Sequence, residues 1–463
     1  MQAMGQRREN DSLGAVDIPA QAYYGPQTQR AVENFAFNGR RMPLEFLYGL
    51  ARIKRLAATV NHDLGELTAE SASAIAKAAR EVEQGRWDDQ FPVEVFQTGS
   101  GTSSNMNMNE VLATRANEIL TGRKQAKHPV HPNDQVNRGQ SSNDVIPSAL
   151  HLAAVVAIRE QLVPALKGLD KTLQKRAREF ADLPKIGRTH LMDAVPMTLG
   201  QEFGGFARQM ELAQERLQGP LGRLAELPLG GTAVGTGLNA HPEFAGRVIG
   251  ELARETGFAF VEARDHFEAQ GARDAVVETS GVLKTIALGL AKIANDIRWL
   301  ASGPRCGLGE LRLPALQPGS SIMPGKVNPV IPEAVIQVAA QVVGHDTILT
   351  LAGQGGFFQL NTMMPLMVQA LMESIRLLAA AARALDKKCI TGLSADEKVC
   401  RGNIEKSLAL VTALVPYLGY DRAAKVAKTA YESGCTIREV VLAEKLLDPG
   451  QLEALLPPQD LNR

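Results

Sequence analysis

Residues 271–301 limit the folds open to this chain more than any other segment. Apolar side chains recur along them at helical spacing. A helix of that length spans roughly 45 Å, which is unusual in a compact domain and typical of an extended helical bundle. Alanine and glycine fill neighbouring positions, which suggests helices on several sides, including helices of other subunits. A long helix kinked within one domain is the alternative. The apolar stripe consists of Val276, Leu283, Ile286, Leu290, Ile293, Ile297 and Leu300.

Most of the remaining chain also has helical periodicity. A helix is predicted from Pro43 through Val60, and long helices follow in the middle of the chain. Residues 1–40 are instead predicted to form an irregular, strand-like cap, because glycine and proline interrupt any helix there. The pattern therefore predicts a mainly α protein. The other predicted helices are 69–84, 107–120, 145–180, 199–217, 360–384, 396–414, 420–432 and 437–444.

Composition excludes several classes of protein. The chain has 463 residues, of which 45% are hydrophobic, so it can bury a large core. Fifty Lys and Arg balance fifty Asp and Glu, which leaves no basic field for nucleic acid or an anionic membrane. Four cysteines without a C-x-x-C pair indicate reduced thiols in the cytosol rather than disulfides or structural zinc. Residues 1–12 are polar and no long apolar run occurs, so we expect neither a secretory signal nor a membrane span.

Four polar segments interrupt the predicted helices. They are TGSGTSSNMNMNE (98–110), HPNDQVNRGQSSND (131–144), GRTHLMDAVP (187–196) and GSSIMPGKVNPVIPE (319–333). Carboxylates are sparse in them, whereas neutral and cationic donors are frequent, and this mixture suits binding of a small polycarboxylate. The donors are Ser100, Thr102, Ser141, Ser142, Asn143, Thr189, His190, Ser320, Ser321, Lys326 and Asn328.

Nucleotide-binding loops do not fit these segments. Five residues separate Gly319 from Gly325, Val327 stands where a Walker A loop needs Ser or Thr, and Pro324 removes a backbone donor. GGTAVGTG (230–237) lacks the G-x-G-x-x-G spacing and is predicted to form a tight turn between two helices.

A metal site is the alternative for one short motif. His128 and His131, with Asp134, could supply ligands, but Pro129 and Pro132 prevent them from sharing one helix face. A polar loop is the favoured interpretation.

Five ordered motifs resemble one family. GSSIMPGKVN resembles the signature loop of the fumarase/aspartase superfamily. TGSGTSSNMNMNE, HPNDQVNRGQSSND, KIGRTHLMDAVPMTLGQE and LGGTAVGTGLNAHPEFA resemble segments of class II fumarases. The similarity runs from about Asp11 through the C-terminal helices.

The resemblance implies a three-domain fold. We expect an N-terminal domain (1–140), a central helical-bundle domain (141–390) and a small C-terminal helical domain (391–463). It implies that five long helices per subunit form a 20-helix core in a homotetramer. Each active site of the family is built from loops of three subunits, which would explain why the polar segments lie far apart in sequence.

The resemblance also implies a reaction. Class II fumarases interconvert fumarate and (S)-malate in the citric acid cycle, here in the cytoplasm, without metal or another cofactor and without a nucleic-acid or membrane partner. Removal of a proton next to one carboxylate produces an aci-carboxylate, which preorganised donors stabilise more in the transition state than in the ground state.

Roles follow for individual residues by resemblance. Ser320 is expected to be the general base, with Ser321 as the alternative, and His190 the second catalytic residue, oriented by Glu333. The alternative role for His190 is to organise its loop by hydrogen bonding. The expected substrate-binding residues are Ser100, Gly101, Thr102, Ser141, Ser142, Asn143, Thr189, Ser321, Lys326, Val327 and Asn328.

HPND resembles the family's secondary dicarboxylate site, formed here by His131, Pro132, Asn133 and Asp134. Some relatives carry an arginine just upstream where this chain has a histidine, so occupancy of the site stays open.

Two other functions compete. NPVIPE and TIREVVL also resemble aspartate ammonia-lyase, but that enzyme typically has Gln at the position of His190 and AGAG in place of TGSG. A catalytically silent bundle that binds dicarboxylates is the second alternative, and the set Ser320, His190 and Lys326 argues against it. Argininosuccinate and adenylosuccinate lyases share the signature loop but not TGSGT.

Overall fold

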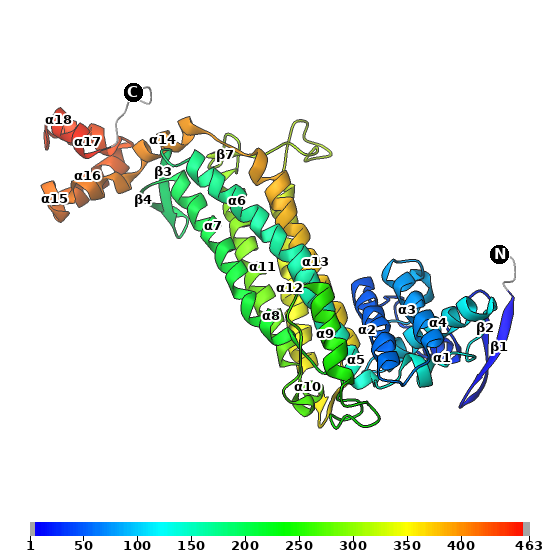
Figure 1. Cartoon of the computed structure of the whole chain (residues 1–463). Helices are drawn as coiled ribbons and strands as arrows, with labels where there is room; N and C mark the ends of the chain where they lie inside the picture. Colours follow the sequence, from blue (N-terminus) through cyan, green and yellow to red (C-terminus); the bar gives the residue numbers. More distant parts are fainter. Residues whose placement is uncertain (1–4, 457–463) are drawn as a thin grey trace. The chain divides into compact units, whose positions relative to one another are not determined.

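A computed structural model describes residues 5–456 of the chain. The predicted mainly α fold is confirmed: within these residues long helices dominate, and the β-structure consists of small two-stranded sheets (Figure 1). The outer ends of the predicted terminal domains, 1–4 and 457–463, lie outside the described residues. The three-domain division stays a prediction.

The chain divides into two compact units. Unit 1 comprises Met1–Pro164, Glu215–Ala287 and Ala340–Ala379, and unit 2 comprises Ala165–Gln214, Leu288–Ala339 and Ala380–Arg463. Five helices contribute residues to both units: α6 (Val163–Glu179), α7 (Leu199–Arg216), α11 (Asp274–Leu300), α12 (Val330–Gly353) and α13 (Met364–Lys388).

Unit 1 begins with an antiparallel hairpin of β1 (Gln6–Asp11) and β2 (Gly14–Pro19). Helices α2 and α3 pack closely together and also contact α5 and α4, respectively. Further elements are α1 (Pro26–Asn34), α2 (Leu44–Asp63), α3 (Ala69–Glu83), η1 (Asp88–Gln90), α4 (Thr102–Thr121), η2 (Pro132–Val136), α5 (Ser142–Ala157), η3 (Ile158–Leu162), α8 (Gln218–Leu224), β5 (Glu226–Leu227), α9 (Phe244–Thr256), β6 (Val261–Glu262), α10 (His266–Gly271), β8 (Gly356–Phe357) and β9 (Leu360–Asn361).

Unit 2 combines long-helix segments with the C-terminal helices, which are orange to red in Figure 1. Buried apolar side chains such as Leu410, Val426 and Val441 form a core for these short helices. The elements are α6 (Val163–Glu179), β3 (Pro184–Thr189), β4 (Met192–Thr198), α7 (Leu199–Arg216), β7 (Leu311–Arg312), η4 (Ile390–Gly392), β10 (Ser394–Ala395), α14 (Glu397–Lys406), η5 (Leu408–Leu414), α15 (Val415–Leu418), α16 (Tyr420–Ser433), α17 (Ile437–Ala443) and α18 (Pro449–Leu455).

The helix predicted over 271–301 forms as α11, which is 27 residues long. All seven side chains of its apolar stripe are buried, and Leu300, the most exposed of them, retains 4% exposure. Regular spacing of apolar residues therefore placed both the helix and its inward face correctly.

Several local predictions were wrong. Helix α1 forms within the supposed irregular cap, because Pro26 occupies the first helical turn, where a missing N–H costs nothing. Helix α4 begins at Thr102, five residues before the predicted start at 107. Residues 187–196 lie in the β3–β4 hairpin rather than in a loop. Helices α9 and α12 form where no helix was predicted.

Three helical segments are long and apolar enough, by length and composition alone, to cross a membrane: Ser142–Glu179, Val330–Gly353 and Met364–Gly392. Within the chain, 67% of the apolar window of the first segment, 33% of that of the second and 72% of that of the third is buried. The expectation that no segment spans a membrane stays a prediction.

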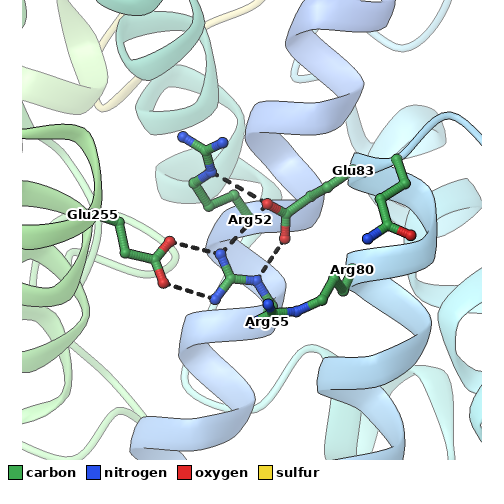
Figure 2. Close-up of a pocket in the computed structure, with 6 residues that line it drawn as sticks. Arg52, Arg55, Arg80, Glu83 and Glu255 are labelled. Carbon is green, nitrogen blue, oxygen red and sulfur yellow. Dashed lines mark hydrogen bonds and ion pairs between the residues drawn. The ribbon is translucent and has the colours of Figure 1, made fainter.

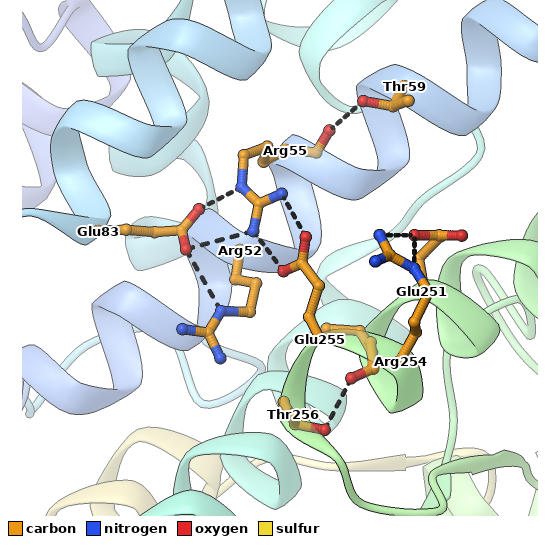
Figure 3. A network of polar contacts seen from close by, with 9 residues as sticks. Arg52, Arg55, Thr59, Glu83, Glu251, Arg254, Glu255 and Thr256 are labelled. Carbon is orange, nitrogen blue, oxygen red and sulfur yellow. Dashed lines mark hydrogen bonds and ion pairs between the residues drawn. The ribbon is translucent and has the colours of Figure 1, made fainter.

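An arginine holds three helices of unit 1 together. Arg55 of α2 donates hydrogen bonds to Glu83 of α3 and to Glu255 of α9, and Arg52 adds a further bond to Glu83 (Figure 3). These residues line a hollow of about 440 Å³ together with Arg80 and Gln84 (Figure 2). Because the carboxylates of Glu83 and Glu255 already accept hydrogen bonds from the guanidinium of Arg55, we interpret the cluster as a structural link between helices and not as a ligand site.

Candidate active site

A chain of three hydroxyl groups joins two of the polar segments in unit 1. Ser100 Oγ lies 2.8 Å from Thr102 Oγ1, and Thr102 Oγ1 lies 2.7 Å from Ser142 Oγ. The first two residues stand at the start of α4 and the third at the start of α5. Backbone N–H groups at the start of a helix are free to bind an anion, so the two helix ends suit a carboxylate.

Local sequence creates both helix starts. Gly101 adopts a φ of 73°, the left-handed conformation that glycine tolerates best. A Cβ at this position would lie 2.9 Å from Ile146 Cγ2, so the turn also needs a residue without a side chain. At the second start, Ser141 caps α5 and forms a capping box with Asp144.

Asn143 is tied to a third segment of unit 1. Its Nδ2 donates to the carbonyl of Ala233, at 2.8 Å. This contact brings the glycine-rich segment 230–237 against the start of α5. Ser141, Ser142 and Asn143 are all half-buried, so each residue keeps part of its surface open to solvent.

In unit 2, His190 stands at the tip of the β3–β4 hairpin. Thr189 pairs with Met192, so His190 and Leu191 form a two-residue turn, with φ of 56° and 61°. Positive φ at both positions is typical of the hairpin turn compatible with strand twist. Thr189 and His190 are exposed.

Buried charges support the same hairpin. Arg188 of β3 donates from both terminal nitrogens to Glu310, at 3.1 and 2.6 Å, and Glu310 is fully buried. Lys185 Nζ lies 2.8 Å from a carboxylate oxygen of Glu202 and 3.5 Å from one of Glu310. Burial alone would lower the pKa of Arg188, but its bonds to Glu310 raise that pKa above the usual value. The network fixes the strand that leads to His190.

The signature segment, also in unit 2, folds into a closed loop before α12. Gly319 N donates to the carbonyl of Lys326 at 2.7 Å, and Asn328 Nδ2 donates to the carbonyl of Gly319 at 2.7 Å. Gly325, with φ of 80°, makes the turn at the far end. Ser321, Lys326 and Val327 lie exposed on this loop.

Ser320 has an environment that suits a base. Its Oγ accepts hydrogen bonds from the backbone N–H groups of Ile322, at 3.2 Å, and Met323, at 2.9 Å. Donors aimed at a hydroxyl oxygen stabilise the alkoxide relative to the alcohol. The loop's own backbone thus supplies part of the stabilisation that a serine base requires.

Known proteins resemble this chain along its whole length. A family model described as "Lyase" matches residues 14–344, and one described as "Fumarase C C-terminus" matches residues 410–463. A class II fumarate hydratase of Nitrosomonas europaea is 52% identical, and the match covers 98% of each chain.

Solved structures of related proteins have the same fold as this chain. A class II fumarase from Schistosoma mansoni superposes with a TM-score of 0.95 at 38% identity, covering 99% of each chain. A fumarate lyase:delta crystallin from Brucella melitensis, bound to cobalt, gives a TM-score of 0.93 at 47% identity, covering 97% of this chain and 98% of its own. The chain belongs to the class II fumarase family. The family predicted from the five motifs is therefore confirmed.

The residues expected from the class II fumarase resemblance fall into two groups. Unit 1 holds Ser100, Gly101, Thr102, Ser141, Ser142 and Asn143, and contacts join them. Unit 2 holds Thr189 and His190 on the hairpin, and the loop with Ser320 through Glu333. Glu333 lies in the first turn of α12, and among residues 5–456 no hydrogen bond or ion pair joins its side chain to His190. The predicted pairing of these two residues stays a prediction.

The HPND segment has a local role in the structure. His131 caps η2: its Nδ1 accepts from the N–H groups of Asn133, at 3.2 Å, and Asp134, at 3.4 Å. Its use as a second dicarboxylate site stays a prediction. Over residues 5–456, no group of three or more His, Cys, Asp or Glu is placed to hold a metal ion.

Sequence reasoning missed one residue beside the site. Asp144 was quoted as the end of a polar segment and given no role, yet its carboxylate is buried and contacts two loops. The spacing Ser141-x-x-Asp144 is the capping-box pattern, which could have identified half of this arrangement.

Proposed function

We propose that this chain is a class II fumarate hydratase, which interconverts fumarate and (S)-malate by acid–base catalysis without a metal ion or organic cofactor. Full-length identity of about one half to curated fumarate hydratases supports the reaction. The Ser320 hydroxyl, which accepts two backbone N–H bonds, carries the assignment of the base.

The proposed chemistry follows from the two groups of residues. Ser320 removes a proton from the carbon next to one carboxylate of malate. Charge then moves onto that carboxylate, where hydroxyl, amide and ammonium donors stabilise the aci-carboxylate. The protonated imidazole of His190 donates a proton to the departing hydroxyl group, which leaves as water, since imidazole can gain and lose a proton near neutral pH. The proposed substrate-binding residues are Ser100, Gly101, Thr102, Ser141, Ser142, Asn143, Thr189, Ser321, Lys326, Val327 and Asn328.

We further propose a homotetramer. The apolar window of α12 is only 33% buried within one chain, and Leu351 on this helix is 60% exposed. A long apolar surface of this kind marks an interface. Association of four copies would cover it and could bring polar segments of different copies into one site.

A cytoplasmic location completes the proposal. Cys389 and Cys400 are buried free thiols, and Cys306 and Cys435 are exposed free thiols, a pattern suited to a reducing compartment. The long apolar helical segments 142–179 and 364–392 are mostly buried within the chain, which supports a place in a protein core rather than in a bilayer.

The decisive test uses purified full-length protein, treated with a chelator. We expect (S)-malate to produce the ultraviolet absorbance of fumarate, with no requirement for added metal. Turnover of aspartate with release of ammonia, and none of malate, would instead identify an aspartate ammonia-lyase. Binding of dicarboxylates with no turnover of either substrate would support the silent-bundle alternative.

A matched pair of variants tests the base. Ser320→Ala should lower kcat by roughly a thousandfold or more, whereas Ser321→Ala, which removes only a proposed substrate-binding hydroxyl, should mainly raise KM. The opposite result would transfer the role to Ser321. Sedimentation of both variants checks that the tetramer persists.

A further inference from the structure

We propose that Asp144 is a positioning residue: its buried carboxylate joins the 141–143 turn to the 230–232 turn and so fixes the donors of the proposed dicarboxylate site. The inference rests on the assignment of Ser141, Ser142 and Asn143 to substrate binding.

The two oxygens of Asp144 serve different segments. Oδ1 accepts from the N–H of Ser141 at 2.9 Å, which is the ordinary capping-box contact. Oδ2 accepts from the N–H groups of Gly230, at 3.0 Å, and Thr232, at 2.9 Å. A helix cap needs only the first contact. The second links α5 to a segment 86 residues away in the sequence.

A second link runs beside the first. Asn143 Nδ2 donates to the carbonyl of Ala233 at 2.8 Å, and Ser141 Oγ accepts from Asn143 N at 3.2 Å. The orientation of the Asn143 amide therefore depends on where the 230–233 backbone lies. Because Asp144 holds that backbone through two N–H groups, its carboxylate controls the direction of a proposed substrate donor without touching substrate.

Lys54 supplies the opposite charge inside the same core. It is fully buried, and its Nζ donates to Asn137 Oδ1 at 2.7 Å. Asn137 Nδ2 in turn donates to the carbonyl of Gln140, the residue just before the 141–143 turn, at 3.0 Å. The turn is thus held from both sides, by Asp144 through its carboxylate and by Lys54 through Asn137.

Electrostatics agree with this geometry. Burial raises the pKa of Asp144 to about 6, against the effect of its backbone hydrogen bonds and of Lys54. Burial lowers the pKa of Lys54 to about 7, against the effect of Asp144. Each charge therefore favours the charged form of the other. Loss of one alone leaves an uncompensated charge in the core.

The test compares full-length variants by steady-state kinetics with fumarate and by thermal unfolding. Asp144→Asn keeps the size of the side chain but presents an NH₂ group to N–H donors, so at least one bond is lost. We expect kcat/KM to fall by roughly tenfold or more. Glu110→Gln is the matched control, since Glu110 is a buried carboxylate that accepts from the N–H groups of Gly25, Gln27 and Thr28 without touching the site. It should lower the unfolding temperature but leave kcat/KM within about twofold.

A double variant separates positioning from stability. Asp144→Asn with Lys54→Met removes both buried charges, so it should recover much of the unfolding temperature lost in the single variant. The kinetic defect should persist, because removal of Lys54 does not restore the hydrogen bond that the amide of asparagine fails to accept. This variant also provides a folded protein if Asp144→Asn alone unfolds.

Two outcomes would overturn the inference, one by removing the role of Asp144 and the other by removing the turn from the substrate site. If Asn143→Ala lowers kcat/KM while Asp144→Asn and the double variant behave like Glu110→Gln, Asp144 has only a structural role. If Asn143→Ala and Ser141→Ala both leave kcat/KM unchanged, the assignment of this turn to the substrate site is wrong, and the inference fails with it. Fumarate turnover by the unsubstituted enzyme is measured first, so a failure of the proposed reaction is recognised separately.

Discussion

Replacement of Glu310 by glutamine should damage both the stability of unit 2 and the rate of catalysis. Glu310 is fully buried and receives the two terminal nitrogens of Arg188, with Asn403 Nδ2 donating at 3.2 Å. Lys185 Nζ is 3.5 Å away. The substitution removes the carboxylate charge that contacts both Arg188 and Lys185.

The magnitude follows from burial. Removing one partner of a buried ion pair costs roughly 3–5 kcal/mol. Glutamine retains one acceptor oxygen, and Lys185 keeps its contact with Glu202 at 2.8 Å, so the lower end applies. A loss of about 3 kcal/mol corresponds to a fall in unfolding temperature of roughly 6–12 °C for a unit of this size. Because Arg188 lies on the strand that leads to His190, kcat should fall as well.

Thermal and urea unfolding followed by circular dichroism measure the first effect, and absorbance of fumarate measures the second. Glu243→Gln is the control, since Glu243 pairs with Arg247 on the exposed surface of α9, with 57% of its side chain accessible. Exposed pairs contribute less than about 1 kcal/mol. An equal shift in the two variants would refute the reasoning, because burial would then make no difference.

Three further predictions concern unit 1. Gly99→Ala should prevent folding of the segment before α4, because the added Cβ would lie 1.8 Å from the carbonyl oxygen of Thr362. Gly250→Ala is the control, since a Cβ there meets no atom within 4 Å and should be tolerated. Soluble yield and unfolding temperature distinguish the two variants. Arg55→Met leaves two carboxylates without their shared partner and should cost about 1–3 kcal/mol, with urea midpoints as the measurement. Burial lowers the pKa of His151 to about 3, so between pH 3 and about 6.5 the unfolded chain binds more protons than the folded one. The stability of the protein should therefore fall as the pH drops from about 6.5 towards 3. His151→Gln should reduce the fall in unfolding temperature that is measured over the same pH range.

Sequence alone located most long helices. The stripe of α11 repeats every three or four residues, so it encodes the helix and its buried face within a single local segment. The motifs also identified the family, because residues such as Ser320 and Lys326 stand in ordered patterns that need no coordinates. Helix α12 was not predicted, because its own apolar residues lie on all sides of the helix and give no single apolar face.

The tertiary structure decided how the site is held. The Ser320 hydroxyl accepts its two N–H groups in the turn that the loop adopts, and the positive φ of His190 follows from strand register, not from residue preference. The second oxygen of Asp144 finds its donors 86 and 88 residues away. Periodicity shows which face of a helix is apolar, because the spacing of residues within one segment determines that face. It cannot report which distant backbone N–H meets a buried carboxylate, because only chain folding sets that distance.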